Sequence, residues 1–378
     1  MSVPVMGDTF TNRETGEVFY GYATQTKRGD KTLVRVGKSH KARYIKPGDY
    51  RVEWDLVGRR NQVIVIPIQE EIELECETAA FERAIKASSN QGPAFILIEI
   101  DTPGGRMNLM KRICSAITKT DNCVTVGFVS GGKYGGAYSA GAIIALACNY
   151  VYMAEDTALG AATPILESGL AFEDLKSAFG RTVGEKFLSA SRGYVASIAE
   201  GNGRSGLLAK AMVDEDIRVV EVTDGGERFF IDPSEQRRGE SVVRRWSERG
   251  SLLTLTASEA VECGIADGLA DSQKSIVSRF RLDEPRIVQS TEPVKARRKF
   301  EAAKEKMEKL IISIDRHVKE VEVNEDKGES IRLLDKLIKK YKELISLKKA
   351  NADLPVTIEA CKKAINSAEA ARRNIKKL

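Results

Sequence analysis

Apolar and polar positions follow three different patterns along the chain, and each pattern marks a region. Residues 1–60 carry short β-type runs separated by turn residues, such as GEVFYGYATQ and DKTLVRVGK, which is typical of a small β unit, for instance a partly open barrel. From residue 62, continuous apolar runs of strand length (QVIVIPI, AFILIEI, CVTVGFV) alternate with stretches of helical period. Beyond residue 292 glycine nearly vanishes, and apolar side chains recur every seven residues.

The middle region predicts an α/β domain whose strands are covered by helices on both sides, because strands and helices alternate. The expected order is strand 62–68, helix 77–88, strand 95–100, helix 106–119, strand 123–129, helix 138–148 and strand 149–154. The later stretch LLTLTASEAVECGIADGLA predicts a strand, a capped helix that begins near Thr256 or Ser258, and a closing glycine turn. Residues 166–183 are expected to form a loop or lid. The chain is therefore predicted to have three domains: 1–60, 61–291 and 292–378.

The C-terminal region predicts about three helices, over residues 294–322, 329–350 and 356–377. In the first helix, Phe300, Met307, Ile314 and Val321 form a repeat of seven residues, and similar apolar stripes follow in the other two. This coiled-coil-like pattern favours a helical hairpin or small bundle that serves self-association or binds a partner protein.

Composition and charge exclude several classes of protein. With 42% hydrophobic and 30% charged residues, the chain has the balance of a folded globular protein. The net charge of +5 is spread over cations interleaved with acidic residues, so no nucleic acid is expected. The six cysteines are scattered without a CxxC pair, which predicts reduced, mostly buried thiols and no zinc site. The N-terminus shows no signal peptide, and the longest apolar run, 140–154, is shorter than the roughly 20 residues that span a bilayer. We therefore expect a cytoplasmic protein without a membrane span.

Two glycine-rich loops, DTPGG and SGGKYGG, follow predicted strands, where sites of α/β domains gather. Ser139 comes after the second loop and directly before the apolar run AGAIIALA, so we place it in the first turn of a helix, where unpaired amides favour negative charge. On position alone, a serine that only caps the helix is the simpler interpretation. The amides of Ala140 and Gly105 could form an oxyanion hole.

A nucleophilic serine also needs a base. The two histidines, His40 and His317, lie outside the α/β region, so a Ser-His-Asp triad within it is not available. A lysine with a lowered pKa can replace histidine. The candidates near Ser139 in sequence are Lys133, Lys176, Lys186 and Lys210.

Five ordered segments resemble NfeD-type serine proteases, a family of the ClpP/crotonase fold related to signal peptide peptidase A. The segments are VIVIPIQEEIE, IEIDTPGG, GGAYSAGAIIALACNYVYMAEDTALGAATPI, GEKFLSASRGYVASIAEGNGR and LLTLTASEAVECGIADGLA, between residue 62 and about residue 270. The resemblance implies a superhelix of strand-strand-helix units and a Ser-Lys dyad. It places the nucleophile on Ser139, the base on Lys186, and the oxyanion glycine on Gly105 or Gly104.

Helical spacing suggests how neighbouring residues contribute. Lys186 would share a face of its helix with Ala190, Gly193 and Ser197, a small-residue face that suits a lysine pressed against the domain. Thr163 in GAATPI could orient the ammonium group, or it could be a plain turn threonine.

We further expect the residues before the serine to contact the substrate, namely Gly131, Gly132 and Lys133.

The function that these features predict is a serine endopeptidase that cleaves a polypeptide through an acyl-enzyme, without a metal or organic cofactor, in a homo-oligomer. One alternative is a crotonase-type acyl-CoA enzyme, which usually needs a carboxylate facing the oxyanion hole; near Ser139 only Glu155 and Asp156 are offered. The other alternative is a non-catalytic Clp-fold scaffold.

Overall fold

The computed structural model describes residues 7–36, 41–53, 61–120, 122–168, 171–280, 282 and 285–377. The chain divides into two compact units. Unit 1 consists of Met1–Glu73 and Phe81–Thr291, and unit 2 consists of Leu74–Ala80 and Glu292–Leu378. Helix α1 (Glu75–Ser89) therefore begins in unit 2 and ends in unit 1.

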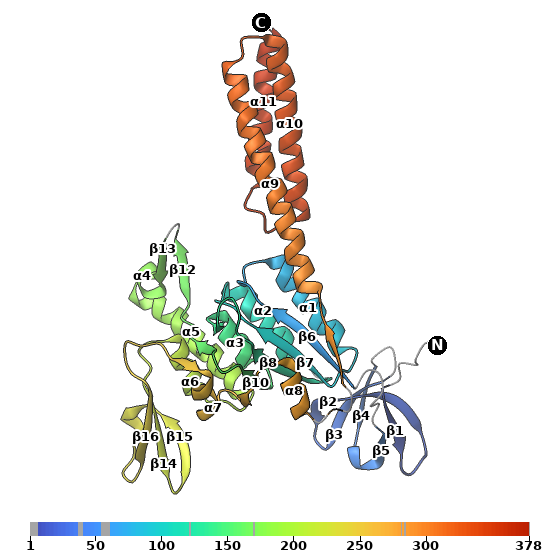
Figure 1. The fold of residues 1–378 in the computed structure, drawn as a ribbon, viewed down its shortest axis with the longest axis vertical. Helices are drawn as coiled ribbons and strands as arrows, with labels where there is room; N and C mark the ends of the chain where they lie inside the picture. The colour runs from blue at the N-terminus through green and yellow to red at the C-terminus, as the bar shows by residue number, and fades with distance from the viewer. Residues whose placement is uncertain are drawn as a thin grey trace. The chain divides into compact units, whose positions relative to one another are not determined.

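A six-stranded, all-parallel sheet forms the centre of unit 1 (Figure 1), in the order β18-β10-β8-β7-β6-β19. The strands are β6 (Gln62–Ile68), β7 (Phe95–Ile100), β8 (Val124–Val129), β10 (Tyr150–Met153), β18 (Gly268–Leu269) and β19 (Arg286–Gln289). Ile64 and Ile66 point into the main core of unit 1, whereas Val63 and Val65 pack on the opposite face with Ile276. Successive side chains of a strand face opposite sides, so a strand that is buried on both faces is continuously apolar. The predicted α/β arrangement is confirmed.

Helices of unit 1 close both faces of this sheet. They are α2 (Met107–Thr118), α3 (Ala140–Leu146), α5 (Arg181–Glu200), α6 (Gly206–Val213), α7 (Ala257–Glu262) and α8 (Gln273–Arg279). Helix α7 begins at the predicted place, because Thr256 and Glu259 form a capping box. On the face that carries the main core, α2 and α3 pack against the strands through Ile113 and Ile144.

A second, three-stranded sheet carries the segment before Ser139. Its order is β17 (Thr254–Thr256), β11 (Ala158–Gly160) and β9 (Gly136–Tyr138), with β9 and β11 parallel. Ser139 and Ala161 directly follow these parallel strands, so both residues emerge at the same edge of the sheet. The bridge between Thr102 and Ala137 joins β9 to the segment that follows β7.

Two parts of unit 1 differ from the prediction. Residues 166–183 are not a loop: they contain most of the antiparallel hairpin β12 (Ile165–Ser168) and β13 (Ala171–Asp174), then α4 (Leu175–Phe179) and the start of α5. The short strands show too little alternation to be recognised. An antiparallel sheet of β14 (Val219–Asp224), β15 (Glu227–Ile231) and β16 (Ser241–Ser247) was also not predicted. The buried Glu221 obscures the apolar pattern of this sheet. Its carboxylate accepts a hydrogen bond from Trp246 Nε1 at 3.0 Å.

The N-terminal part of unit 1 is an antiparallel sheet in the order β4-β3-β2-β1-β5. Its strands are β1 (Asp8–Asn12), β2 (Val18–Arg28), β3 (Lys31–Val36), β4 (Lys41–Ile45) and β5 (Tyr50–Glu53). Phe10 and Phe19 stack in its core with their ring centroids 5.0 Å apart. In the described part of the chain, β4 and β5 are its edges. His40 lies outside the described residues.

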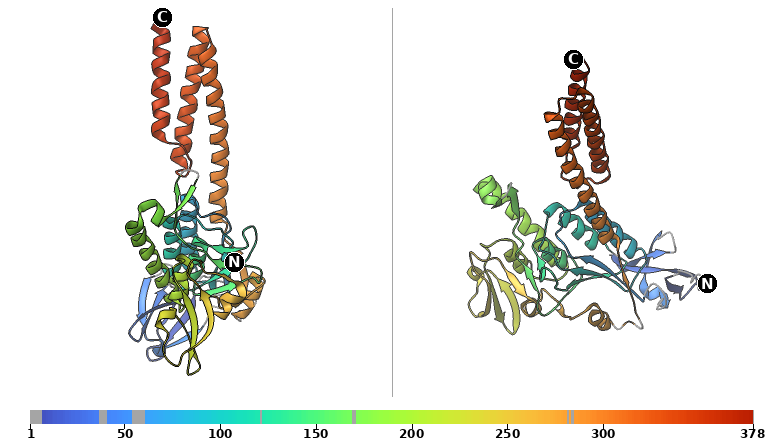
Figure 2. Two further views of the ribbon diagram at one scale, coloured as in Figure 1. Left: turned by 90° about the vertical axis from the view of Figure 1, so that its left-hand side faces the viewer. Right: turned by 45° about the horizontal axis from the view of Figure 1, so that its top comes forward.

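Unit 2 is a bundle of three long helices, α9 (Glu292–Val323), α10 (Lys327–Ala350) and α11 (Ile358–Lys377), which lie side by side (Figures 1 and 2). The predicted apolar stripes meet inside this bundle, where Phe300, Met307 and Leu334 are buried. Asp353, in the loop between α10 and α11, accepts hydrogen bonds from the amides of Glu75 and Cys76 at 2.9 and 3.0 Å. The stripes expected to serve self-association are therefore largely buried within one chain.

Candidate active site

Ser139 has an unusual backbone conformation at the turn from β9 into α3. Its φ of 51° and ψ of −120° are strained for a residue with a side chain. It occupies the N-cap position of α3, yet its hydroxyl makes no capping hydrogen bond. Its amide donates to the Gly160 carbonyl at 2.9 Å, which fixes the turn against β11. The hydroxyl of Ser139 has no partner among the described residues, so the simpler interpretation as a helix cap does not hold.

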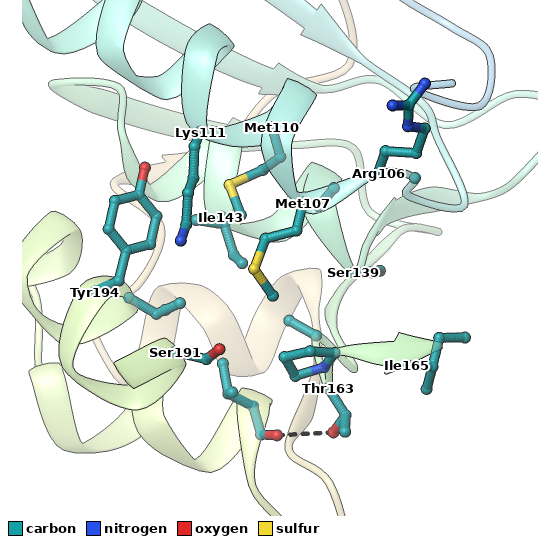
Figure 3. A pocket seen from close by; sticks show the side chains of 16 residues that line it. Arg106, Met107, Met110, Lys111, Ser139, Ile143, Thr163, Ile165, Ser191 and Tyr194 are labelled. Carbon is teal, nitrogen blue, oxygen red and sulfur yellow. Dashed lines mark hydrogen bonds between the residues drawn. The ribbon is translucent and has the colours of Figure 1, made fainter. Parts of the chain in front are cut away.

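Ser139 lines two adjoining hollows. The smaller hollow, which we call the side-chain pocket, has a volume of about 120 Å³ and is lined by α2, α3, α5 and the segment around Thr163 (Figure 3). The larger hollow, which we call the groove, has a volume of about 840 Å³ and extends past Glu71, Pro103, Ala161 and Leu252. Seven residues line both: Gly105, Arg106, Met107, Lys111, Ser139, Thr163 and Ile165. The serine thus lies where a large hollow meets a small one.

The DTPGG loop lies directly against the serine. A Cβ atom on Gly104 would lie 2.5 Å from Cβ of Ser139, so Gly104 leaves room that no other residue would leave. The Gly104 amide donates to Thr102 Oγ1 at 3.1 Å and is therefore occupied. Around Gly105, the Ile72 amide donates to the Gly104 carbonyl and the Arg106 amide donates to the Ile72 carbonyl, each at 2.8 Å.

These bonds leave two amides beside Ser139 without acceptors. Within the described ranges, no hydrogen bond is made by the amide of Gly105 or by that of Ala140, and both residues line the side-chain pocket. A pair of backbone donors next to a hydroxyl is the arrangement that an oxyanion hole requires. Of the two glycines considered from the sequence, Gly105 is the one whose amide is unoccupied.

The SGGKYGG loop is held by a buried aspartate. The Asp101 carboxylate accepts from the amides of Tyr134 and Gly136, both at 3.1 Å, and a Cβ on Gly132 would lie 2.7 Å from Asp101 Oδ2. Neither Gly131 nor Gly132 is among the described residues that line the pocket or the groove. These glycines shape the loop, and the structure does not bring them to the site as the sequence had suggested.

Lys133 is a paired cation at the surface. Its Nζ lies 3.0 Å from Glu70 Oε2, and hydrogen bonds with Tyr134 and Glu70 raise the pKa of Lys133. A base must be neutral when the serine reacts, so this shift has the wrong sign for a competing base. Lys133 lines neither hollow among the residues described there, which also removes the support for its expected contact with substrate.

Lys186 is exposed on α5 and is not among the described residues lining either hollow. The same helix sends Ser191 and Tyr194 into the pocket. Lys186 precedes Ser191 by five residues, which is roughly 140° around a helix. The structure therefore does not bring Lys186 to Ser139.

The prediction that the small-residue face of α5 presses on the domain is wrong. The residues of that face, Ala190, Gly193 and Ser197, are exposed. Leu188 and Val195 are buried in the main core of unit 1 in their place. Larger apolar side chains remove more apolar surface from water, so they determine which face turns inward.

The other residues weighed from the sequence lie away from the reacting centre or are engaged elsewhere. Thr163 Oγ1 donates to the Val213 carbonyl at 2.8 Å (Figure 3). Lys210 is half-buried on α6 and lines neither hollow, and the side chain of Lys176 lies outside what the structure describes. Glu155 and Asp156 are exposed, and neither lines the pocket. The carboxylate that the acyl-CoA alternative requires is therefore missing from the described lining of the pocket.

Sequence reasoning missed Lys111. It lies on α2, lines both the pocket and the groove, and its Nζ is 5.1 Å from the centroid of the Tyr194 ring. The signal was present in the sequence, because Met107, Met110 and Lys111 follow the spacing i, i+3, i+4 of one helix face. Lys111 was overlooked because only lysines after the SGGKYGG loop or within it were considered.

A cysteine behind the pocket does not compete with Ser139 as nucleophile. Cys114 on α2 is fully buried, and its Sγ lies 3.8 Å from the Ile143 carbonyl. Burial raises the pKa of Cys114 to about 12, so the reactive thiolate is scarce at neutral pH. Among the described residues, no cluster of His, Cys, Asp and Glu could hold a metal ion.

Comparison with known proteins identifies the family of the central region. Residues 62–237 match the family model of the NfeD1b N-terminal domain. Over 236 residues the chain is 26% identical to the membrane protein NfeD1b of Bacillus subtilis, which covers 62% of this chain and 45% of the relative. Over 143 residues it is 30% identical to the membrane-bound protease PH1510 of Pyrococcus horikoshii, covering 37% of this chain and 30% of the relative. The chain spans less than half the length of these relatives.

Two solved structures of a protease called 1510-N, described as membrane-bound and stomatin-specific, are also similar. A serine-to-alanine variant is 20% identical with a TM-score of 0.45, covering 62% of this chain and 99% of that chain. A lysine-to-alanine variant in complex with a substrate peptide is 24% identical with a TM-score of 0.41, covering 57% and 78%.

The names of the two relatives correct one expectation from the sequence. Both are membrane proteins by name, so the predicted cytoplasmic location is wrong. No helix of the described residues is long and apolar enough to cross a bilayer.

Proposed function

Because residues 62–237 form an NfeD-type N-terminal domain, we propose that the protein is a serine endopeptidase with Ser139 as its nucleophile. One observation carries the proposal. A strained serine, with its hydroxyl unpartnered among the described residues, lies where the groove meets the pocket, beside the Gly105 and Ala140 amides. Strain at a residue that caps nothing is typical of a site whose geometry serves function.

In the proposed reaction, a peptide lies along the groove and Ser139 Oγ attacks its carbonyl carbon. The amides of Gly105 and Ala140 hold the oxyanion, which needs donors at about 2.7–3.1 Å from the oxygen. The C–N bond then breaks, the amine leaves with the proton that the serine gave up, and an acyl-enzyme remains. Water then gives its proton to the base and adds to the ester carbonyl, whose oxyanion the same amides hold. The bond between the acyl carbon and Ser139 Oγ breaks, the carboxylic acid product leaves, and Oγ takes back the proton.

We propose Lys186 as the base that takes the serine proton, as the family resemblance implies. Since Lys186 is exposed, the part of α5 that precedes the buried Leu188 must turn or shift when peptide fills the groove. Such a movement would place the amine near Ser139 and remove it from water, which lowers the pKa of a lysine. Catalytic hydrogen bonds often form only in the substrate complex. Lys111 is less suited as base, because its amine lies against the Tyr194 ring, with Nζ 5.1 Å from the ring centroid.

Several broader statements belong to the same proposal. The domain 61–291 would be a Clp-type superhelix of strand-strand-helix units, preceded by a β domain, 1–60, and followed by a helical arm, 292–378. The peptidase would act at a membrane, in keeping with the names of its relatives. It would assemble into a homo-oligomer or bind a partner protein through the outer surface of the arm, since the inner apolar stripes are buried. Comparing the mass of the full chain with that of residues 1–291 in solution tests this role of the arm.

A non-catalytic scaffold is the second candidate, and one observation favours it. In the described residues, no lysine amine is hydrogen-bonded to the Ser139 hydroxyl, so the proposed dyad is not assembled. A fluorophosphonate probe separates the two functions. A peptidase reacts at Ser139, which peptide mass spectrometry detects, and Ser139→Ala abolishes the reaction. Ser278→Ala, which changes an exposed serine of α8, is the control and should react as the wild type does. A folded protein that never reacts at Ser139 would make the scaffold the better function.

A further inference from the structure

Resting on the proposed function, we propose that the side-chain pocket receives the substrate side chain next to the scissile bond, and that Lys111 selects an acidic side chain there. Nothing in the family resemblance concerns Lys111. The inference follows from the size of the pocket, its walls and its charge.

The volumes of the two hollows suggest what each can hold. Pockets for cofactors and drug-sized ligands measure about 300–1,000 Å³, whereas the side-chain pocket has about 120 Å³, which suits a single amino-acid side chain. The groove, with about 840 Å³, has room for several residues of peptide. Ser139 lines both. A peptide whose main chain follows the groove therefore presents one side chain to the pocket when its carbonyl meets the serine.

The walls of the pocket are mostly apolar and firmly held. Met110, Ile143 and Val195 are 3%, 5% and 1% exposed, so these side chains are set by the core and not by the ligand. Ser191 Oγ donates to the Phe187 carbonyl at 2.9 Å, so its proton is already used. Walls of this kind accept the methylene stem of a substrate side chain, and they leave its recognition to the charged group in the pocket.

That charged group is Lys111. Figure 3 shows its amine reaching into the pocket beside Tyr194, and the described residues give Lys111 no ion pair or hydrogen bond. The other charged residue in the described lining is Arg106, also a cation, whose guanidinium donates to the Glu73 carbonyl at 3.3 Å. The described lining holds no carboxylate. A pocket that holds cations and no carboxylate in its described lining attracts a carboxylate and repels a further cation.

Tyr194 does not cancel this charge. Burial, reinforced by the neighbouring Cys114, raises the pKa of Tyr194, so the phenol stays neutral at physiological pH. A neutral ring beside an ammonium group holds the cation in place through its π face. Lys111 is therefore positioned as a cation at the wall of the pocket, which is what recognition of an acidic side chain requires.

The experiment uses three peptidyl diphenyl phosphonates that react with a nucleophilic serine. They differ only in the residue next to phosphorus, which mimics glutamate, glutamine or lysine. The rate of modification of Ser139 in the full chain is followed by intact mass. We expect the glutamate probe to react about tenfold faster than the glutamine probe, and the lysine probe to react slowest. In Lys111→Met the ratio of the glutamate to the glutamine rate falls to about one, and in Lys111→Glu the order of glutamate and lysine reverses.

Lys119→Met is the matched control, because Lys119 caps the other end of α2 and lines neither hollow with Ser139 in the described part of the chain. Its ratio should equal that of the wild type. Equal rates for glutamate and glutamine in the wild type, or a ratio that survives Lys111→Met, would overturn the inference while leaving the peptidase intact. Loss of all labelling in folded Lys111→Met would also overturn it, by making Lys111 the base. A wild type that reacts with none of the probes, nor with fluorophosphonate, removes the proposed function itself.

Discussion

Helices α2 and α5 both line the side-chain pocket, but they place their lysines differently. On α2, Lys111 lies on the stripe that faces the pocket, together with Met107 and Met110. On α5, Ser191 and Tyr194 face the pocket, whereas Lys186 is exposed on another face. Helix α2 thus places the Lys111 amine at the pocket, although the family resemblance does not point to this residue. Helix α5 places Lys186, the lysine that the resemblance selects, away from the pocket.

The difference between the helices lies in their helical phase. Helix α2 is fixed by a fully buried stripe that includes Leu109, Ile113 and Cys114, so the neighbouring stripe with Lys111 must face the pocket. Helix α5 is fixed by Leu188 and Val195, and this phase exposes Lys186. A resemblance between sequences identifies the helix that carries a residue, but the apolar face decides where that residue points. Substitutions of Lys111 and Lys186 therefore give the most direct test of this difference between α2 and α5.

Replacing the two lysines should produce the largest effect. If α5 moves on substrate binding, Lys186→Ala removes the base and slows fluorophosphonate labelling of Ser139 by about 10²-fold or more. Lys111→Met should slow it by about tenfold at most, because it removes a charge from the pocket and not the proton acceptor. The measurement is the labelling rate at saturating probe.

Lys210→Ala serves as control, since Lys210 on α6 lines neither hollow among the described residues. If Lys111→Met abolished labelling while Lys186→Ala did not, the base would belong to α2, and the resemblance would have selected the wrong helix. Equal losses in both variants would show that the two helices act together.

The phase of α5 is tested by its stability. Leu188 is 7% exposed in the main core of unit 1, so Leu188→Ala should lower the free energy of unfolding by about 2–4 kcal/mol. Val183→Ala on the first turn of the same helix is the control, because Val183 is 43% exposed; its loss should stay under about 1 kcal/mol. Trp246 is buried in unit 1, and Trp54 lies outside the described residues, so fluorescence in urea is followed in a background with Trp54→Phe and reports on unit 1. Equal losses for the two variants would contradict the observed phase.

Much of the fold could be predicted from the sequence, because its strands are long, apolar and buried on both faces. The predicted strands 62–68 and 95–100 coincide with β6 and β7, which are seven and six residues long. Their sequences are almost entirely apolar, as expected for strands that are buried on both faces. The sheet of β14, β15 and β16 escaped because the buried Glu221 interrupts its apolar pattern, and this residue forms an ion pair with Arg228, whose Nε lies 2.5 Å from its carboxylate. Pairing between distant side chains leaves no periodic trace in a sequence.

The candidate site was predictable only in part, for the same reason. That the DTPGG loop belongs to the site of Ser139 was expected, because its glycines expose backbone amides and leave room for a substrate, but the close approach of Gly104 to Ser139 was not predicted. The role of Asp101 was not, because its bonds to Tyr134 and Gly136 join loops over thirty residues apart. The exposure of Lys186 was missed because the small residues of α5 were taken for its buried face.

A substitution on the small-residue face of α5 tests which face of this helix is turned inward. It should raise the free energy of unfolding if that face is exposed and lower it if that face is buried. A Cβ on Gly193 would meet no atom within 4 Å, so Gly193→Ala should raise the free energy of unfolding by about 0.5–1 kcal/mol through its better helix propensity. If Gly193 instead pressed against the domain, the added methyl group would be destabilising. Gly203→Ala is the control with equally open space but a φ of 75°, and it should lower stability because alanine is strained there.

The smallest expected effect is the contribution to the free energy of unfolding from an ion pair between α2 and α1, and this contribution depends on pH. Arg112 on α2 donates to Glu82 on α1, with Nε 3.0 Å from Oε1 and Nη2 2.6 Å from Oε2. The hydrogen bond with Arg112 lowers the pKa of Glu82. A lowered pKa in the folded state means that the pair stabilises the protein above the unfolded pKa of glutamate, about 4.3, and that this contribution is lost as the pH falls through the folded pKa.

Because the two side chains are 37% and 35% exposed, we expect only about 0.5 kcal/mol. The difference in urea stability between wild type and Glu82→Gln should be constant from pH 7 to 5 and should shrink below pH 4. Adding Arg112→Met completes a double-mutant cycle, and a coupling energy that is the same at pH 7 and pH 3 would show that the pair does not anchor α2.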